Sequence, residues 1–102
     1  MPTKTEKKLE SNIVKALTEV CENYKEKAEG FEWLTHVYKS KNKGLKIYCV
    51  FQNRQFIQTA RADSIIDSFS KDIITELFGI GVDVSAHDVE FIDESEAGHK
   101  GL

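Results

Sequence analysis

The sequence predicts an α+β fold, a two-layer sandwich in which two helices cover one face of a three-stranded sheet. Two segments have apolar residues at helical spacing, and three segments have the composition of strands. Their order along the chain is α-β-β-α-β. The helix between the second and third strands implies a right-handed crossover, which places both helices on one face. At 102 residues the chain has room for a single domain with one core.

The first helix is predicted from about residue 6 to residue 27, because its apolar residues recur every three or four positions. This stripe consists of Leu9, Ile13, Ala16, Leu17, Val20, Cys21, Tyr24 and Ala28. Gly30 then ends the helix, since glycine adopts the left-handed conformation without steric strain.

Residues 31–39 and 45–52 are rich in aromatic and β-branched residues, and the polar stretch SKNKG between them predicts an antiparallel hairpin. Regular alternation divides the hairpin into two faces. The core face is expected to carry Phe31, Trp33, Thr35, Val37, Leu45, Ile47, Cys49 and Phe51. The opposite face is expected to carry Glu32, Leu34, His36, Tyr38, Lys46, Tyr48 and Val50, joined by Glu90 and Ile92.

Residues 53–61 are either a short helix or an irregular link, with Phe56 and Ile57 turned inward. A second helix is predicted to start near Asp63 or Ser64, where Ser64 and Asp67 have the spacing of a capping box. Its apolar stripe consists of Ile66, Phe69, Ile73, Leu77 and Phe78. Gly79 and Gly81 end it, and Val82 and Val84 are expected to fold back over its last turn.

A third strand is predicted over residues 87–93, where Val89 and Phe91 alternate with polar residues. We expect it beside the first strand, with the order 1-2-3 as the alternative. The domain therefore covers residues 1–93. Residues 94–102 are expected to form a disordered acidic tail.

The net charge of −3 is unevenly distributed along the chain. Residues 1–34 sum to −1, residues 35–62 to +6 and residues 63–102 to −8. A modest total thus conceals a basic central segment and an acidic end, which bears on the choice of partners.

The face opposite the core is more apolar than solvent requires, which predicts an interface with a second copy or another protein. The residues expected to form it are Leu34, His36, Tyr38, Tyr48, Val50 and Ile92. In the alternative, residues 53–61 or the chain's own termini cover this face. The leading hypothesis is thus a non-enzymatic interaction or regulatory domain.

A nucleic-acid binding module is the alternative function, because cations lie near stackable rings in the hairpin. The cations are Lys39, Lys41, Lys43, Lys46, Arg54 and Arg61. In a simpler interpretation these lysines are a solvated turn that prevents pairing between sheet edges. In a third possibility Asp93, Glu94 and Glu96 shield the basic tip of the hairpin.

No pattern in the sequence predicts catalysis, a cofactor, a metal site or a small-molecule substrate. Cys21 and Cys49 lie at core positions and fit buried apolar side chains better than nucleophiles. His36 fits a packing role. No apolar run is long enough to span a membrane, and residues 1–10 lack a signal peptide, so a cytoplasmic location is expected.

The stretch ALTEVCENYKEKAEGFEWLTHVY, continuing through LKIYCVF to VEFIDES, resembles a small bacterial family of about this length. Its members often carry the label "Fis family transcriptional regulator". The resemblance implies membership of that family but no particular activity, and the acidic, strand-like end has no helix-turn-helix pattern. The predicted order α-β-β-α-β is also similar to KH-like folds, including that of a ribosome-binding factor of small-subunit maturation.

Overall fold

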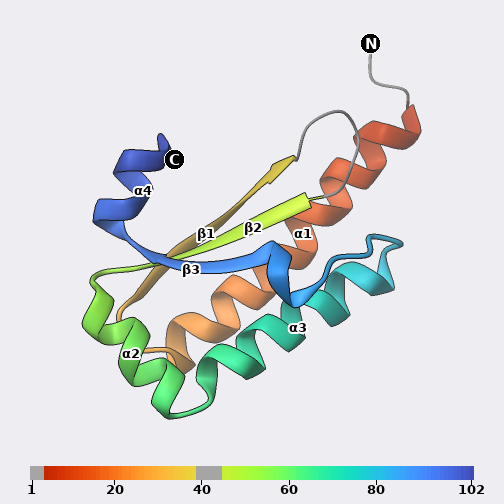
Figure 1. Cartoon of the computed structure of the whole chain (residues 1–102). Helices are drawn as coiled ribbons and strands as arrows, with labels where there is room; N and C mark the ends of the chain where they lie inside the picture. Colours follow the sequence, from red (N-terminus) through yellow and green to blue (C-terminus); the bar gives the residue numbers. More distant parts are fainter. Residues whose placement is uncertain (1–3, 39–44) are drawn as a thin grey trace.

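A computed structural model describes residues 4–38 and 45–102 of the chain (Figure 1). The elements are α1 (Lys4–Lys27), β1 (Phe31–Tyr38), β2 (Leu45–Phe51), α2 (Arg54–Ala62), α3 (Ile65–Gly79), a 3₁₀ turn (Ala86–Asp88), β3 (Val89–Asp93) and α4 (Glu94–Lys100). The α+β class is confirmed. Residues 53–61, which the sequence left ambiguous, belong largely to α2.

The three strands have the order β1-β2-β3, with β2 antiparallel to β1 and parallel to β3. The preferred prediction, with the third strand beside the first, is therefore wrong, and the alternative order 1-2-3 is confirmed. The central position suits β2, because Tyr48 to Phe51 is a continuous apolar run. Such a run is typical of a strand covered on both faces.

On one face of the sheet, which we call the helix face, α1 and α3 lie side by side (Figure 1). Its buried residues include Ile13, Leu17, Val20, Ile47, Cys49, Phe51, Ile73 and Leu77. The ring of Phe69 lies in the middle of this core. Tyr24 stacks on it at 4.1 Å between ring centroids, and Phe31 and Phe91 meet it edge-on at 4.9 and 5.5 Å.

Polar contacts also join α1 to α3. The Tyr24 hydroxyl lies 2.5 Å from Asp72 Oδ2, to which it donates, and 3.1 Å from Ser68 Oγ. Burial, together with the hydrogen bond to Asp72, raises the pKa of Tyr24 above its usual value. The phenol is therefore held in its neutral, donating form.

A β-bulge at Glu32 overturns the predicted alternation of β1. Phe31 pairs with Phe51, but the next pair is Trp33 with Val50, so Glu32 is an extra residue on β1. Residues 33–37 consequently face the side opposite to the predicted one. Leu34 and His36 lie on the helix face, whereas Trp33, Thr35 and Val37 lie on the other face, which we call the open face.

Two features at the start of α2 fix its position. Asn53 caps its start, because the Asn53 side chain accepts a hydrogen bond from the Phe56 N–H at 3.2 Å. Phe56 then packs against Gly30, where a Cβ would lie only 2.2 Å from Phe56 Cγ and where φ is +82°. Gly30 therefore both ends the turn after α1 and admits the Phe56 ring.

The predicted capping box at the start of α3 is wrong. Ser64 has φ of 62°, in the left-handed region, and its side chain forms no cap hydrogen bond. Its N–H donates to Arg61 O at 3.2 Å and its C=O accepts from the Ser68 N–H at 3.2 Å, so Ser64 joins α2 to α3 without a side-chain cap. The predicted end of the helix is confirmed, because α3 stops at Gly79 and Val82 N–H folds back to Leu77 O.

The acidic end of the chain differs from the predicted disordered tail, because residues 94–100 form α4. Asp93 caps this helix by accepting a hydrogen bond from the Glu96 N–H at 2.8 Å. Ala97 is buried and packs with Val50 and Ile92 on the open face. A segment after the predicted domain boundary thus covers part of the sheet.

Candidate interaction site at the free edge of β3

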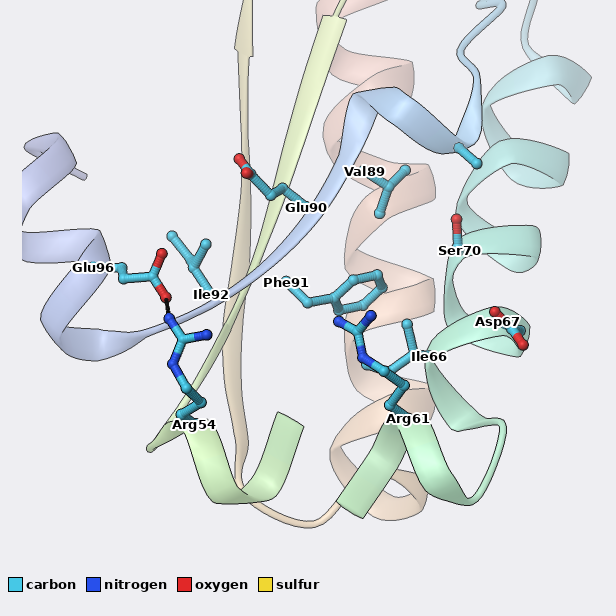
Figure 2. A pocket seen from close by; sticks show the side chains of 11 residues that line it. Arg54, Arg61, Ile66, Asp67, Ser70, Val89, Glu90, Phe91, Ile92 and Glu96 are labelled. Carbon is cyan, nitrogen blue, oxygen red and sulfur yellow. Dashed lines mark hydrogen bonds and ion pairs between the residues drawn. The ribbon is translucent and has the colours of Figure 1, made fainter. Parts of the chain in front are cut away.

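β3 is an edge strand, because in the described part of the chain it pairs with β2 on one side only. The other edge of such a strand presents main-chain N–H and C=O groups without strand partners. An open pocket of about 450 Å³ lies along this edge (Figure 2). It is lined by Arg54, Arg61, Ile66, Asp67, Ser70, Ala86, Val89, Glu90, Phe91, Ile92 and Glu96.

Consecutive residues of β3 form one wall of the pocket. Val89 and Phe91 face the helix face, whereas Glu90 and Ile92 face the open face. Since residues of both faces line the same pocket, the edge of the strand itself is turned toward it.

Two arginines of α2 line the opposite side of the pocket. Arg54 and Arg61 are seven positions apart, so they lie on one helix face, about 10 Å apart along the axis. Arg54 forms an ion pair with Glu96, just beyond the end of β3, and Arg61 points toward Phe91 (Figure 2). The helix α2 therefore runs antiparallel to β3.

The two arginines differ in their partners. The Arg54 guanidinium is bound to Glu96, whereas the exposed Arg61 side chain has no ion pair or hydrogen bond with any residue that the structure describes. Arg61 is thus a cation beside the strand edge without a partner in the described chain.

The pocket contains charges of both signs. Arg54 and Arg61 contribute +2, and Asp67, Glu90 and Glu96 contribute −3, which leaves −1. The electrostatic field of the pocket therefore does not favour a polyanion. Instead, it suits a partner surface that itself carries both signs.

The described members of the predicted interface do not form a contiguous exposed patch on the open face. Val50 and Ile92 lie on that face but are buried under α4. The prediction that Leu34 and His36 lie there is wrong because of the bulge at Glu32. The alternative prediction, that a terminus of the chain covers this face, explains why Val50 and Ile92 are apolar, because the C-terminal helix α4 packs on them.

The remaining members of that predicted interface differ from one another. Tyr48 lies on the open face, half-buried, with Lys46 Nζ and Lys100 Nζ at 5.3 and 5.5 Å from its ring centroid. The side chain of Tyr38 lies outside the described part of the structure. Tyr48 is thus covered by cations of the chain itself.

The predicted nucleic-acid residues are not brought together among the described residues. Lys46, on β2, lies 3.3 Å from Glu90, and although partial burial opposes its charge, this carboxylate raises the pKa of Lys46. Arg54 and Arg61 lie on α2, beyond the other end of β2. Lys39, Lys41 and Lys43 lie outside the described residues, so the nucleic-acid alternative stays a prediction. The third possibility, that the acidic end shields the basic tip of the hairpin, also stays a prediction.

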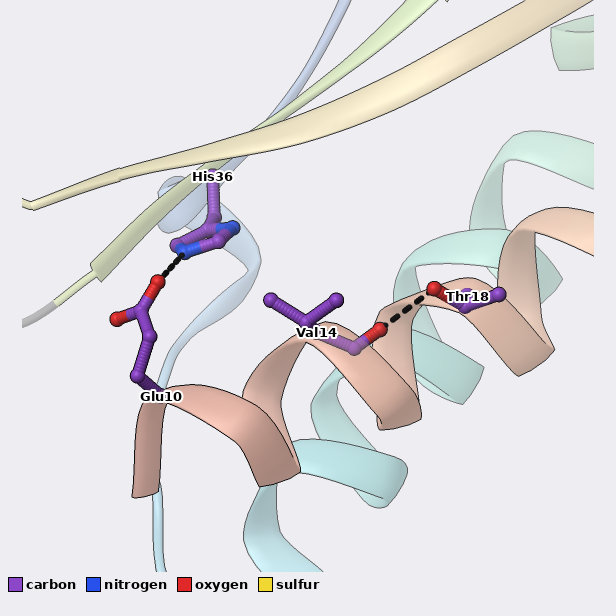
Figure 3. A network of polar contacts seen from close by, with 4 residues as sticks. All are labelled: Glu10, Val14, Thr18 and His36. Atoms are coloured by element: carbon purple, nitrogen blue, oxygen red, sulfur yellow. Dashed lines mark hydrogen bonds and ion pairs between the residues drawn. The ribbon is translucent and has the colours of Figure 1, made fainter. Parts of the chain in front are cut away.

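The cysteines and His36 occupy structural positions. Cys49 is completely buried, and this burial raises the pKa of its thiol well above the usual value. His36 Nε2 lies 3.0 Å from Glu10 Oε1 of α1 (Figure 3).

Among residues 4–38 and 45–102, no group of three or more histidine, cysteine or acidic side chains is placed to hold a metal ion. None of the described helices combines the length and apolar character needed to cross a membrane.

Comparison of the chain with protein-family models, with curated proteins and with solved structures finds no match. Function is therefore inferred from the residues and geometry of this chain. Sequence reasoning missed the pocket because the strand order decides which edge is free. One signal was available, namely the spacing of Arg54 and Arg61 by two helical turns in the ambiguous segment.

Proposed function

We propose that this protein is a non-enzymatic interaction domain that binds a protein through the free edge of β3. The observation that carries the proposal is the unpaired edge of a five-residue strand, turned toward an open pocket. An extended segment can add to such an edge as a further strand. Main-chain hydrogen bonds then supply affinity, and side chains that flank the edge supply selectivity.

The neighbouring side chains suit this mode of binding. Val89 and Phe91 on one side and Ile92 on the other offer apolar contacts to alternate side chains of an added strand. Arg61 offers a cation that has no partner within the described chain. The open face is a weaker candidate, because α4 buries Val50 and Ile92 there.

The proposal is tested by selecting extended segments from a displayed library of random peptides. Selected peptides are then synthesised and added to the dilute protein, and amide hydrogen exchange is measured along the chain. We expect the amides of β3 to become protected, because an added strand forms hydrogen bonds with its edge.

The matched control is Phe78→Ser, which removes an exposed aromatic side chain at the far end of α3 (70% exposed). This variant should bind the selected peptides as the unchanged protein does. If no peptide is selected, or if protection falls on other elements and not on β3, the proposal is wrong.

A further inference from the structure

We propose that the partner at the edge of β3 is a second copy of this chain, and that the two β3 strands pair antiparallel about a two-fold axis. The result is a dimer with one continuous six-stranded sheet. This inference rests on the proposed function, because it uses the same edge, but it commits to one occupant.

The antiparallel arrangement decides which residues meet. Around a two-fold axis, the beginning of one β3 lies beside the end of the other. Arg54 marks the end of β3, through its ion pair with Glu96, and the Arg61 side chain, two helical turns away, points toward Phe91 in the middle of the strand (Figure 2). With the axis beside Ile92, residue 94 of the second copy lies opposite residue 90, so the first turn of its α4 is brought to Arg61.

That first turn carries the complementary charge. Glu94 is exposed, and its carboxylate has no ion pair with any residue in the described part of the chain. Arg61 is exposed and likewise without a carboxylate partner there. In the dimer each unpartnered arginine faces an unpartnered glutamate of the other copy, and symmetry forms this contact twice.

The balance of charge favours this occupant over an acidic one. With two arginines and three carboxylates, the pocket would repel a uniformly acidic segment about as much as attract it. A second copy presents the same mixture of signs in the reverse order, which is the pattern that an isologous interface requires.

The first measurement is the mass of the full chain by light scattering and sedimentation over a series of concentrations. We expect a reversible dimer in the unchanged protein. Arg61→Glu places two like-charge contacts in each dimer, and so does Glu94→Arg. Each should weaken association by about tenfold or more. Both positions are exposed, so unfolding curves should show that the variants keep their fold.

The decisive measurement mixes the two variants. A heterodimer of Arg61→Glu with Glu94→Arg contains two contacts between opposite charges, so association should return in the mixture although each variant alone stays largely monomeric. The matched controls are Lys25→Glu and Glu22→Arg on the exposed surface of α1. They make the same changes of charge and should leave dimerisation unchanged.

A protein that is monomeric at every concentration would overturn the inference. So would a dimer that neither charge reversal weakens, or a mixture in which association does not return. These results are distinguishable from failure of the proposed function. If selected peptides still protect β3 in a monomeric protein, the edge is a binding site for another protein, whereas absence of protection removes the edge as a site altogether.

Discussion

The two faces of the sheet differ in how much of the fold depends on them. On the helix face, α1 and α3 bury a large cluster around Phe69, whose side chain is completely buried. On the open face, α4 is the covering helix among the described elements, and the described cluster there buries Val50, Ile92 and Ala97. The difference indicates that the helix face determines stability, whereas the open face and the neighbouring edge of β3 can change with little effect on it.

The largest expected effect comes from removing one aromatic ring on each face. Phe69→Ala should lower the free energy of unfolding by about 3–5 kcal/mol, because it leaves a cavity between three other rings. Trp33→Ala removes a larger ring on the open face, but Trp33 is only half-buried and should lose about 1–2 kcal/mol. Urea unfolding of both variants measures the difference. Equal losses of unfolding free energy in the two variants would contradict the conclusion that the helix face contributes more to stability than the open face.

A smaller effect is expected from the hydroxyl that joins α1 to α3. Tyr24→Phe keeps the stacking on Phe69 but removes the hydrogen bonds to Asp72 and Ser68, which should lower the free energy of unfolding by about 1 kcal/mol. Tyr48→Phe on the open face is the matched control and should change it by less than about 0.5 kcal/mol.

The same pair of variants tests the pH dependence. The pKa of Tyr24 is raised in the folded state, so above its usual value of 10 the unfolded chain releases a proton that the folded chain retains. The contribution of this group is therefore complete below pH 10 and is lost as the pH rises through the folded pKa. Unfolding curves at alkaline pH should show this loss in the unchanged protein and in Tyr48→Phe, and a smaller loss in Tyr24→Phe. An identical alkaline decline in all three proteins would exclude the assignment.

The smallest effect is expected where α4 is held by a surface ion pair. Arg54→Gln removes the contact with Glu96 and should change the free energy of unfolding by less than about 1 kcal/mol. Amide exchange over residues 94–100 should nevertheless become faster, because this short helix is otherwise held mainly by Ala97. Arg61→Gln is the matched control, since Arg61 has no such contact, and should leave exchange in dilute protein unchanged. If Arg54→Gln does not speed exchange either, α4 does not depend on this ion pair.

The two long helices and the approximate positions of the strands could be predicted from apolar spacing and composition, because α1 and α3 each bury one continuous stripe. The faces of β1 could not. A two-residue alternation assumes an uninterrupted ladder, and nothing in the letters of FEWLTHVY marks Glu32 as an extra residue. One bulge therefore moved Leu34 and His36 away from the predicted interface.

Two other errors had signals in the sequence. Asp93 precedes Glu96 by three positions, acidic residues occupy the first turn of α4, and basic residues occupy its last. These are the signals of a capped helix. The prediction nevertheless gave a disordered tail, because residues 94–102 contain few apolar residues. The strand order was indicated by the continuous apolar run from Tyr48 to Phe51, which is typical of a central strand covered on both faces. The pocket at β3 depends on that order and was missed with it.

The mixed pairing of β2 has a consequence for the kinetics of folding. Its antiparallel partner β1 is its neighbour along the chain, whereas its parallel partner β3 arrives only after the whole of α2 and α3. Because closing the longer loop is slower, we expect the hairpin to form first and β3 to dock last. Until then β2 offers its own unpaired edge, and a β3 strand from another molecule could occupy it. Refolding at high concentration is thus the condition under which strand exchange between copies is most favoured.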